Sequence, residues 1–423
     1  MNIVAKYKDI LKRHSVLFGN FTYISILQIF VMISPLITYP YLVRVLGTEQ
    51  YGWVITAQIV VSYCSILIDF GFKRISARHI SIHRDNKEKL SEIMSAIFTM
   101  QIILWVLCLI VYLIILGSIT TYRQHFWLFL FYYGLTLNEL LFPQYFFQGI
   151  EKMKYITIVN ILMRIISIAL IFVCVNDSMD YVRVPVLYTI GYFAGGVLSL
   201  YVIYGREKLK YRWPSFSSMK YYFKDASLVF YTDVICTIKD KLNYILLGSM
   251  VRVSDVVIYD LGSKFMNVVS KPATIVATVL FPKMAKDRDF MIFKKILVIL
   301  VITTVFVVLI LNLFLPQVVH FFIDEDINLL PIRIYLIAPI LVGASSFISS
   351  NLILALGYTK YVLSSIIFTT IIYLILLAYM YFMGYLTTVT AFVALAVLSY
   401  LGELIYRLYV MVKIEKLERS NIK

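Results

Sequence analysis

The most regular feature of the 423-residue chain is a succession of long apolar stretches separated by short polar segments. A membrane-spanning helix needs about 20 mostly apolar residues, and each stretch meets this length. Twelve spans are predicted on this basis, at 18–41, 53–72, 91–116, 126–148, 155–175, 184–204, 226–249, 255–281, 293–316, 333–356, 360–383 and 388–410. The seventh and eighth stretches are the least apolar. The pattern predicts an all-α integral membrane protein.

The distribution of basic residues supports this assignment and gives it an orientation. With the N-terminus in the cytoplasm, 29 of the 39 Lys and Arg residues fall on the cytoplasmic side and 5 on the opposite side. Cytoplasmic loops of membrane proteins are enriched in Lys and Arg in this way. We therefore expect both termini to be cytoplasmic. Residues 1–18 contain no cleavable signal and are expected to form a short amphipathic helix on the membrane surface.

Composition excludes several classes of protein. Hydrophobic residues make up 61% of the chain and charged residues only 15%, which excludes an ordinary soluble enzyme. The net charge of +15 is accounted for by basic cytoplasmic loops, so no nucleic-acid partner is expected. The five histidines lack metal-ligand spacing, and the chain has no phosphate-binding glycine-rich loop. We expect no metal, no cofactor and no catalytic residue.

A weak internal repeat divides the chain in two. Val-Arg-Val at 43–45 recurs at 251–253, and Gly149 recurs as Gly357, in both cases 208 residues later. Each half contains six predicted helices, so the halves would be related by a pseudo-two-fold axis along the membrane normal. The predicted parts are an N-terminal lobe, a basic cytoplasmic linker, and a C-terminal lobe with a basic tail. Their boundaries are 1–204, 205–225 and 226–423.

Ionisable residues inside the predicted spans are the candidate functional residues. A charge in a membrane span costs a few kcal/mol unless it is paired or faces water. The cations among them are Arg164, Lys239, Lys241, Lys264 and Lys271. The acids are Asp69, Glu139, Asp233, Asp240, Asp260 and Glu403.

Helical spacing groups some of these residues. At about 100° per residue, one stripe of the eighth span carries two of the cations and two further polar residues. The stripe consists of Asp260, Lys264, Asn267 and Lys271. Two interpretations stay open at this point. The cations of the spans bind a phosphate or pyrophosphate group, or the charges pair internally, as Asp260 and Lys264 are spaced to do.

The acids allow a further interpretation, because buried carboxylates can titrate near neutral pH. A coupling proton or sodium ion is a candidate ligand for four of them, namely Glu139, Asp233, Asp240 and Glu403. Asp69 lies at the end of the second span, where pairing with Lys73 or Arg74 is the simpler expectation. Gly191 and Gly195 have the GxxxG spacing that marks a close contact between helices.

Several segments resemble the polysaccharide transporter family, the Wzx-type O-antigen flippases of the multidrug/oligosaccharidyl-lipid/polysaccharide exporter superfamily. They are PYLVRVLGTEQYGWV (40–54), DFGFKRISARHIS (69–81), FPQYFFQGIEKMKYITIVNILMRI (142–165) and VLFPKMAK (279–286). The resemblance implies two six-helix lobes around a cationic lumen in the bacterial inner membrane. It also implies alternating access that moves an undecaprenyl-pyrophosphate-linked oligosaccharide from the cytoplasmic to the periplasmic leaflet.

The resemblance assigns roles to the residues singled out above. The five span cations would meet the pyrophosphate, and Asp260 and Asn267 would add polar lining to the lumen. Expected partners are the lipid-linked substrate, membrane lipids, and a polysaccharide polymerase and chain-length regulator. Three alternatives remain. A polymerase or ligase would be expected to have a large periplasmic loop. A small-molecule exporter would be expected to have an acidic or aromatic cavity. The sequence does not distinguish a flippase for O-antigen from a flippase for another lipid-linked glycan.

Overall fold

The computed structural model describes residues 3–325 and 327–421, with side chains except at 3–18, 21, 282 and 419–421. Within these residues the regular structure is helical throughout, without a β-strand. The elements of the first half are α1 (Ile3–Asp69), α2 (Phe72–Ile82), α3 (Lys87–Ser118), α4 (Thr120–Gln124), α5 (Phe126–Tyr133), η1 (Gly134–Thr136), α6 (Leu137–Leu141), α7 (Gln144–Gly149), α8 (Met153–Cys174), η2 (Ser178–Val182), α9 (Val184–Leu200) and η3 (Tyr201–Arg206). The amphipathic face predicted for residues 1–18 lies outside the described side chains.

The second half repeats much of this order. Its elements are α10 (Phe216–Met250), α11 (Val253–Asp287), α12 (Phe290–Leu313), α13 (Leu315–Phe322), α14 (Leu330–Tyr335), α15 (Ala338–Ile348), η4 (Ser349–Leu354), α16 (Thr359–Phe382) and α17 (Val389–Asn421). The fourth predicted span of each half is divided into short helical segments, at Phe126–Gly149 and Leu330–Leu354. Each is followed by two long helices.

Helix α1 is two helices joined at Gly47. This residue has φ 75° and ψ 164°, outside the helical region, and a positive φ is readily adopted only by glycine. The break lies between the predicted spans 18–41 and 53–72. Gly71, also at φ 75°, then separates α1 from α2. Two glycines thus set the points at which the first part of the chain changes direction.

Eight helical stretches of the described residues are long and apolar enough to cross a membrane. They are Thr22–Ile82, Lys87–Ser118, Met153–Cys174, Val184–Arg206, Phe290–Leu313, Leu330–Leu354, Thr359–Phe382 and Val389–Glu418. The first contains both spans predicted within α1. The stretch Phe126–Gly149 and the helices α10 and α11 are not among the eight, and α10 and α11 contain several charged residues. The total of twelve spans stays a prediction.

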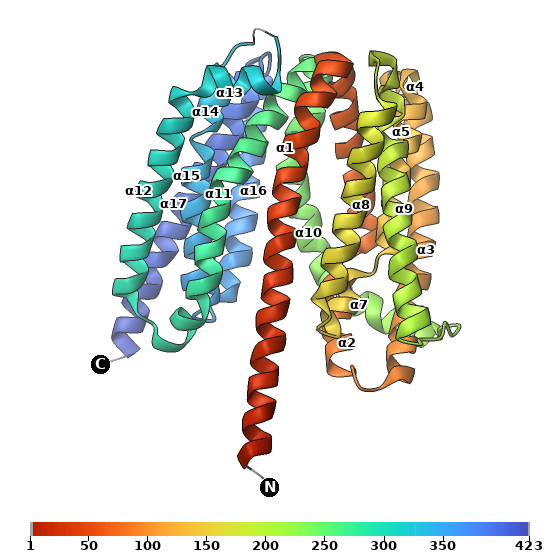
Figure 1. Cartoon of the computed structure of the whole chain (residues 1–423). Helices are drawn as coiled ribbons and strands as arrows, with labels where there is room; N and C mark the ends of the chain where they lie inside the picture. The colour runs from red at the N-terminus through yellow and green to blue at the C-terminus, as the bar shows by residue number, and fades with distance from the viewer. Residues whose placement is uncertain (1–2, 326, 422–423) are drawn as a thin grey trace. The chain divides into compact units, whose positions relative to one another are not determined.

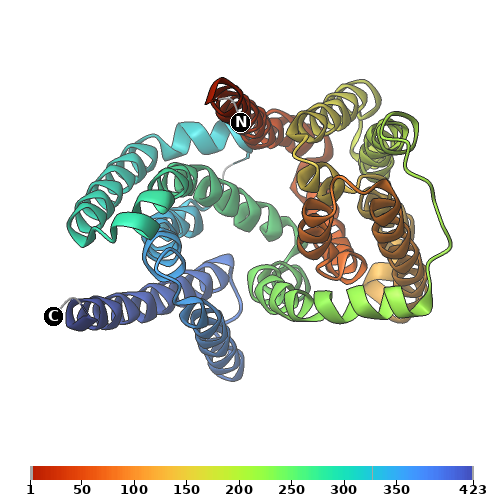
Figure 2. The ribbon, with the colours of Figure 1, turned by 90° about the horizontal axis from the view of Figure 1, so that it is seen from below.

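Contacts divide the chain into two compact units. The first consists of residues 1–50 and 57–234, and the second of residues 51–56 and 235–423. In the first unit, α8 and α9 pack along their length and lie side by side in Figures 1 and 2. A Cβ atom at Gly191 would lie 2.1 Å from Ser167 Oγ, and one at Gly195 would lie 2.3 Å from Met163 Cγ. The close helix contact predicted from the GxxxG spacing is therefore confirmed.

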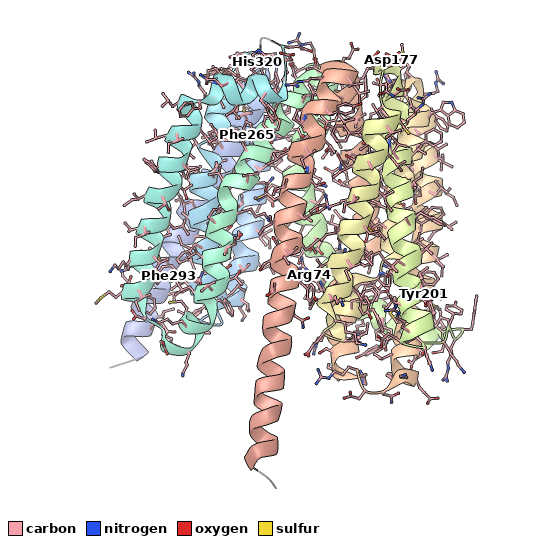
Figure 3. The ribbon with its side chains drawn as sticks, in the orientation of Figure 1. Arg74, Asp177, Tyr201, Phe265, Phe293 and His320 are labelled. Atoms are coloured by element: carbon pink, nitrogen blue, oxygen red, sulfur yellow. The ribbon has the colours of Figure 1, made fainter. Side chains whose placement is uncertain are left out.

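In the second unit, α15 is in contact with α11, α12 and α17. Phe293 of α12, labelled in Figure 3, stacks on Phe347 of α15 with ring centroids 5.3 Å apart. The opposite face of α12 exposes large apolar side chains, including Ile302, Phe306 and Leu309. An exposed apolar face of this kind suits contact with lipid, because it would be unfavourable in water.

Candidate functional site

A cavity of about 260 Å³ lies within the second unit, among α10, α11, α15 and α17. Most of its lining is polar, although the surrounding helices are apolar. The lining residues are Lys239, Asp240, Met266, Asn267, Val342, Ser345, Ser346, Tyr400 and Glu403. Four of these, Lys239, Asp240, Asn267 and Glu403, are among the predicted site residues. The fold therefore brings together polar residues that are up to 164 positions apart in the sequence.

Lys239 of α10 lies between two carboxylates. Its Nζ is 3.5 Å from Glu403 Oε2 and 3.6 Å from Asp240 Oδ1. The side chains of Lys239 and Glu403 are only 12% and 14% exposed, whereas that of Asp240 is 54% exposed. Lys239 Nζ also lies 5.9 Å from the centroid of the Tyr400 ring. A buried ammonium group requires such partners, because desolvation without them is costly.

Arg407 completes this charge cluster. It lies within the predicted span 388–410, but the sequence analysis did not include it among the candidate residues. One of its guanidinium nitrogens lies 2.6 Å from Glu403 Oε1, one helical turn away on α17. Another donates to Ser345 Oγ at 3.0 Å. The Arg407 side chain is 8% exposed. An arginine within an apolar helical stretch, four residues after a glutamate, was the available signal.

The four residues of the predicted stripe on α11 lie in different environments. Lys264 forms an ion pair with Asp260, which also accepts a hydrogen bond from the Tyr244 hydroxyl at 3.3 Å. This is the internal pairing that the i,i+4 spacing allowed. Asn267 is exposed and lines the cavity. Lys271 is half-buried, and it has no ion-pair partner among the described side chains.

A second buried polar group of this unit centres on Asn243 of α10. Its amide nitrogen donates to the Tyr259 hydroxyl at 3.0 Å, and its amide oxygen accepts from the Tyr373 hydroxyl at 2.6 Å. Asn243 and Tyr373 are each 1% exposed. These bonds join α10, α11 and α16, and the sequence analysis did not identify them. The asparagine within an apolar stretch was the signal, since a buried amide needs partners.

Two ion pairs of the first unit involve predicted coupling acids. Lys73 Nζ lies 2.6 Å from Glu139 Oε2, and an Arg74 guanidinium nitrogen lies 2.9 Å from Asp233 Oδ1. Asp69 instead accepts a hydrogen bond from the Lys73 backbone N–H at 3.3 Å. All four acids proposed as coupling residues therefore have a cation within 4 Å. Arg164 of α8 and Lys241 of α10 are half-buried, without an ion-pair partner among the described side chains.

The arrangement favours binding rather than covalent chemistry. Buried charges are mostly paired, and hydroxyl, amide and carboxylate groups surround one small cavity. In the described residues, no group of three or more His, Cys, Asp or Glu side chains is placed to hold a metal ion. Polar groups of this kind inside a helical membrane protein are typical of substrate or ion pathways.

Comparison with known proteins agrees with this fold. The family described as "Polysaccharide biosynthesis protein" matches residues 17–287. A protein of Escherichia coli (strain K12) named "Putative O-antigen transporter" is 29% identical over 184 residues, covering 44% of this chain and 44% of that protein. The chain thus matches less than half the length of this curated relative.

Two solved transporter structures are similar over most of the chain. The first is an inward-facing multidrug resistance MATE family transporter of the MOP superfamily, with a TM-score of 0.69, 13% identity, and coverage of 90% of this chain and 96% of that one. The second is the lipid II flippase MurJ in an inward closed conformation, with a TM-score of 0.67, 17% identity, and coverage of 91% and 86%. At such identities the likeness shows the fold alone. Because the family match spans more than half of the sequence, this chain belongs to the polysaccharide biosynthesis protein family, and it is a multi-pass, all-α membrane protein with a transporter fold.

Proposed function

We propose that the protein is a flippase that moves an undecaprenyl-pyrophosphate-linked oligosaccharide, an O-antigen or similar repeat unit, across the bacterial inner membrane. The observation that carries the proposal is the combination of a polysaccharide biosynthesis family with a fold shared by a lipid flippase. Transport by alternating access between lobes 1–204 and 226–423, joined by the basic segment 205–225, is part of the proposal. The protein would act as a transporter and not as an enzyme.

The chemistry of such a substrate fits the distribution of polar groups. A polyprenyl tail can remain in lipid, while the charged and sugar-bearing head needs a polar route through the protein. Of the five cations predicted to meet the pyrophosphate, Lys239 and Lys264 have carboxylate partners. The other three, Arg164, Lys241 and Lys271, are the better candidates, because their charges are not offset by an ion pair among the described side chains.

Ion coupling is a further element of the proposal. Glu139, Asp233, Asp240 and Glu403 each lie beside a cation, so a coupling role requires that the ion pair opens during the transport cycle. We also propose cytoplasmic termini and an association with a polysaccharide polymerase and chain-length regulator. The basic loops predicted on the cytoplasmic side support the orientation.

The test is deletion of the chromosomal gene in a strain without a second flippase. The expected result is loss of surface polysaccharide, with lipid-linked repeat units accumulating on the cytoplasmic side, and restoration of both by the wild-type gene. The variant Lys271→Ala with Arg164→Ala is expected to restore the polymer poorly. An unchanged polysaccharide profile would contradict the proposal.

The similarity to a MATE transporter favours a second candidate function, export of small molecules. This candidate predicts that deletion raises the sensitivity of the cells to cationic drugs without changing the surface polysaccharide. Measuring both phenotypes in one deletion strain separates the two functions.

A further inference from the structure

The cavity of the second unit has a size that limits what it can hold. At about 260 Å³ it lies just below the range of about 300–1,000 Å³ that is typical of small-molecule sites. An oligosaccharide head with its pyrophosphate is too large for it. The cavity can hold a single group of about the size of one sugar ring, and the chemistry of its lining determines which kind of group binds.

The charges in the wall argue against an anion. Lys239 is within 3.6 Å of both Asp240 and Glu403, so the one cation among the described residues of the cavity lining already has carboxylate neighbours. Behind the wall, Arg407 offsets the charge of Glu403 at 2.6 Å. Two cations therefore face two carboxylates, and a phosphate entering this space would meet carboxylate oxygens. A wall in which carboxylates balance the cations offers a phosphate little net attraction.

The remaining wall suits a neutral group with many hydroxyls. Carboxylates accept hydrogen bonds, the Asn267 amide both donates and accepts, and the Ser346 hydroxyl does either. Ser345 accepts from Arg407 at 3.0 Å, which leaves its own hydroxyl proton available to donate. The half-buried Tyr400 ring offers an apolar face beside these polar groups. Alternating polar groups with one aromatic face match a pyranose, whose rim carries hydroxyls and whose faces carry C–H groups.

We propose that this cavity is a subsite for one sugar residue of the transported oligosaccharide, formed by Lys239, Asp240, Asn267, Ser346, Tyr400 and Glu403. The proposal rests on the proposed flippase function and deepens it, since it separates recognition of the sugar from recognition of the pyrophosphate. Arg407 acts as a positioning residue, because its ion pair and its bond to Ser345 fix two parts of the wall.

Cysteine protection tests the subsite directly. The four native cysteines are replaced by alanine, and Ser346→Cys or Val342→Cys is introduced as two independent labels in the cavity wall. Ser350→Cys is the matched control, because it lies one turn beyond Ser346, has similar exposure and does not line the cavity. Purified protein in nanodiscs is labelled with a charged methanethiosulfonate. The probes are free hexoses, N-acetylhexosamines, 6-deoxyhexoses and hexuronates, with inorganic pyrophosphate as the anion probe.

We expect at least one sugar class to slow labelling at both cavity positions and not at the control. At a sugar concentration equal to the Kd, half of the sites are occupied and labelling slows about twofold. Pyrophosphate is expected to have no effect at these positions. Protection by pyrophosphate alone, no protection by any sugar class, equal protection at Ser350→Cys, or failure of both cavity cysteines to react would each overturn the proposal.

A failure of the subsite proposal can be distinguished from a failure of the flippase proposal. The same cysteine-free variants are tested for restoration of surface polysaccharide in the deletion strain. If sugars protect the cavity but the wild-type gene restores no polymer, the subsite stands and the flippase function falls. If the gene restores polymer but no sugar protects, the flippase function stands and the subsite falls.

Discussion

Glu403 and Arg407 form an ion pair across one turn of α17, with 2.6 Å between Oε1 and a guanidinium nitrogen, and both side chains are less than 15% exposed. Removing one partner of such a pair leaves an uncompensated charge in a site of low polarity. Replacing both can be nearly neutral, because the desolvation penalty disappears along with the attraction. This asymmetry gives the first prediction.

Arg407→Met is expected to lower the free energy of unfolding by about 3–5 kcal/mol, because Glu403 is left with only the more distant Lys239. The measurement is the thermal midpoint of the purified protein in detergent. Arg407→Met combined with Glu403→Gln should recover part of the loss. The exposed Lys416→Met on the same helix is the control. Equal melting of the Arg407→Met and Lys416→Met proteins would refute the structural role of this pair.

Gly52 is expected to tolerate no side chain. A Cβ atom at this position would lie 2.2 Å from the backbone carbonyl oxygen of Val253, a contact that only a backbone shift can relieve. Gly52→Ala should therefore destabilise the second unit by about 1–3 kcal/mol, as overpacking typically does. Gly117→Ala in α3 is the matched control, since nothing lies within 4 Å of its Cβ position. Thermal midpoints of the two variants provide the comparison, and equal values would contradict the close approach.

The ion pairs Lys73–Glu139 and Arg74–Asp233 are expected to differ in strength. Glu139 is 10% exposed and Asp233 is 25% exposed, while Arg74 is 67% exposed and Lys73 is 41% exposed. Lys73→Met should cost about 1–3 kcal/mol, because it leaves a nearly buried carboxylate without its cation. Arg74→Met should cost at most about 1 kcal/mol, as is usual for an exposed pair. Double-mutant cycles with Glu139→Gln and Asp233→Asn measure both couplings, and the reverse order would contradict the prediction.

The orientation of the first unit can be tested with single cysteines. Asp177 lies at one end of the unit and the loop joining α2 and α3 lies at the other (Figures 1 and 3). In a cysteine-free background, Asp85→Cys is expected to react only after the inner membrane is permeabilised. Met179→Cys, whose native side chain is 72% exposed, should react with an impermeant maleimide in cells whose outer membrane has been permeabilised. The opposite pattern would place the N-terminus outside.

The carboxyl group of Asp180, which lies outside the predicted spans, is expected to make the stability of the protein depend on pH. The backbone N–H groups of Asn176 and Asp177 donate to Asp180 at 2.9 and 3.2 Å. These bonds, the Asn176 bond foremost, and the nearby Arg183 lower the pKa of Asp180. Since the folded pKa lies below the unfolded value of about 3.9, the stabilisation is present at neutral pH and is lost as the pH falls through about 4 towards the folded pKa.

Thermal midpoints of wild type and Asp180→Asn should therefore differ most near neutral pH and converge as the pH falls below about 4. Asp85→Asn is the control, because the exposed Asp85 side chain accepts no hydrogen bond among the described residues. A difference that grows on acidification would mean that the sign of the Asp180 contribution is wrong.

Local sequence was sufficient for much of the helical architecture. Apolar stretches of about 20 residues predicted the spans, and the structure has a helix or a series of helical segments at each of them. The physical reason is that a span must satisfy its own backbone hydrogen bonds in lipid. Gly191 and Gly195 indicated a close helix contact because small residues allow backbones to approach. The pair Asp260–Lys264 could also be predicted from the sequence, since residues four apart share one face of a helix.

Tertiary structure decided which distant charges meet. Lys73 pairs with Glu139 and Lys239 with Glu403, partners separated in sequence by dozens to more than a hundred residues. Helical periodicity fixes the face of a side chain on its own helix but not the neighbouring helix that this face meets. Arg407 shows the consequence, because the sequence analysis did not identify it as a candidate residue, whereas packing against α15 and α16 buries it beside Ser345 and Ser365. The sequence by itself thus determined the membrane helices and their local pairs, while three-dimensional packing determined which charges remain unpaired and where a polar cavity forms.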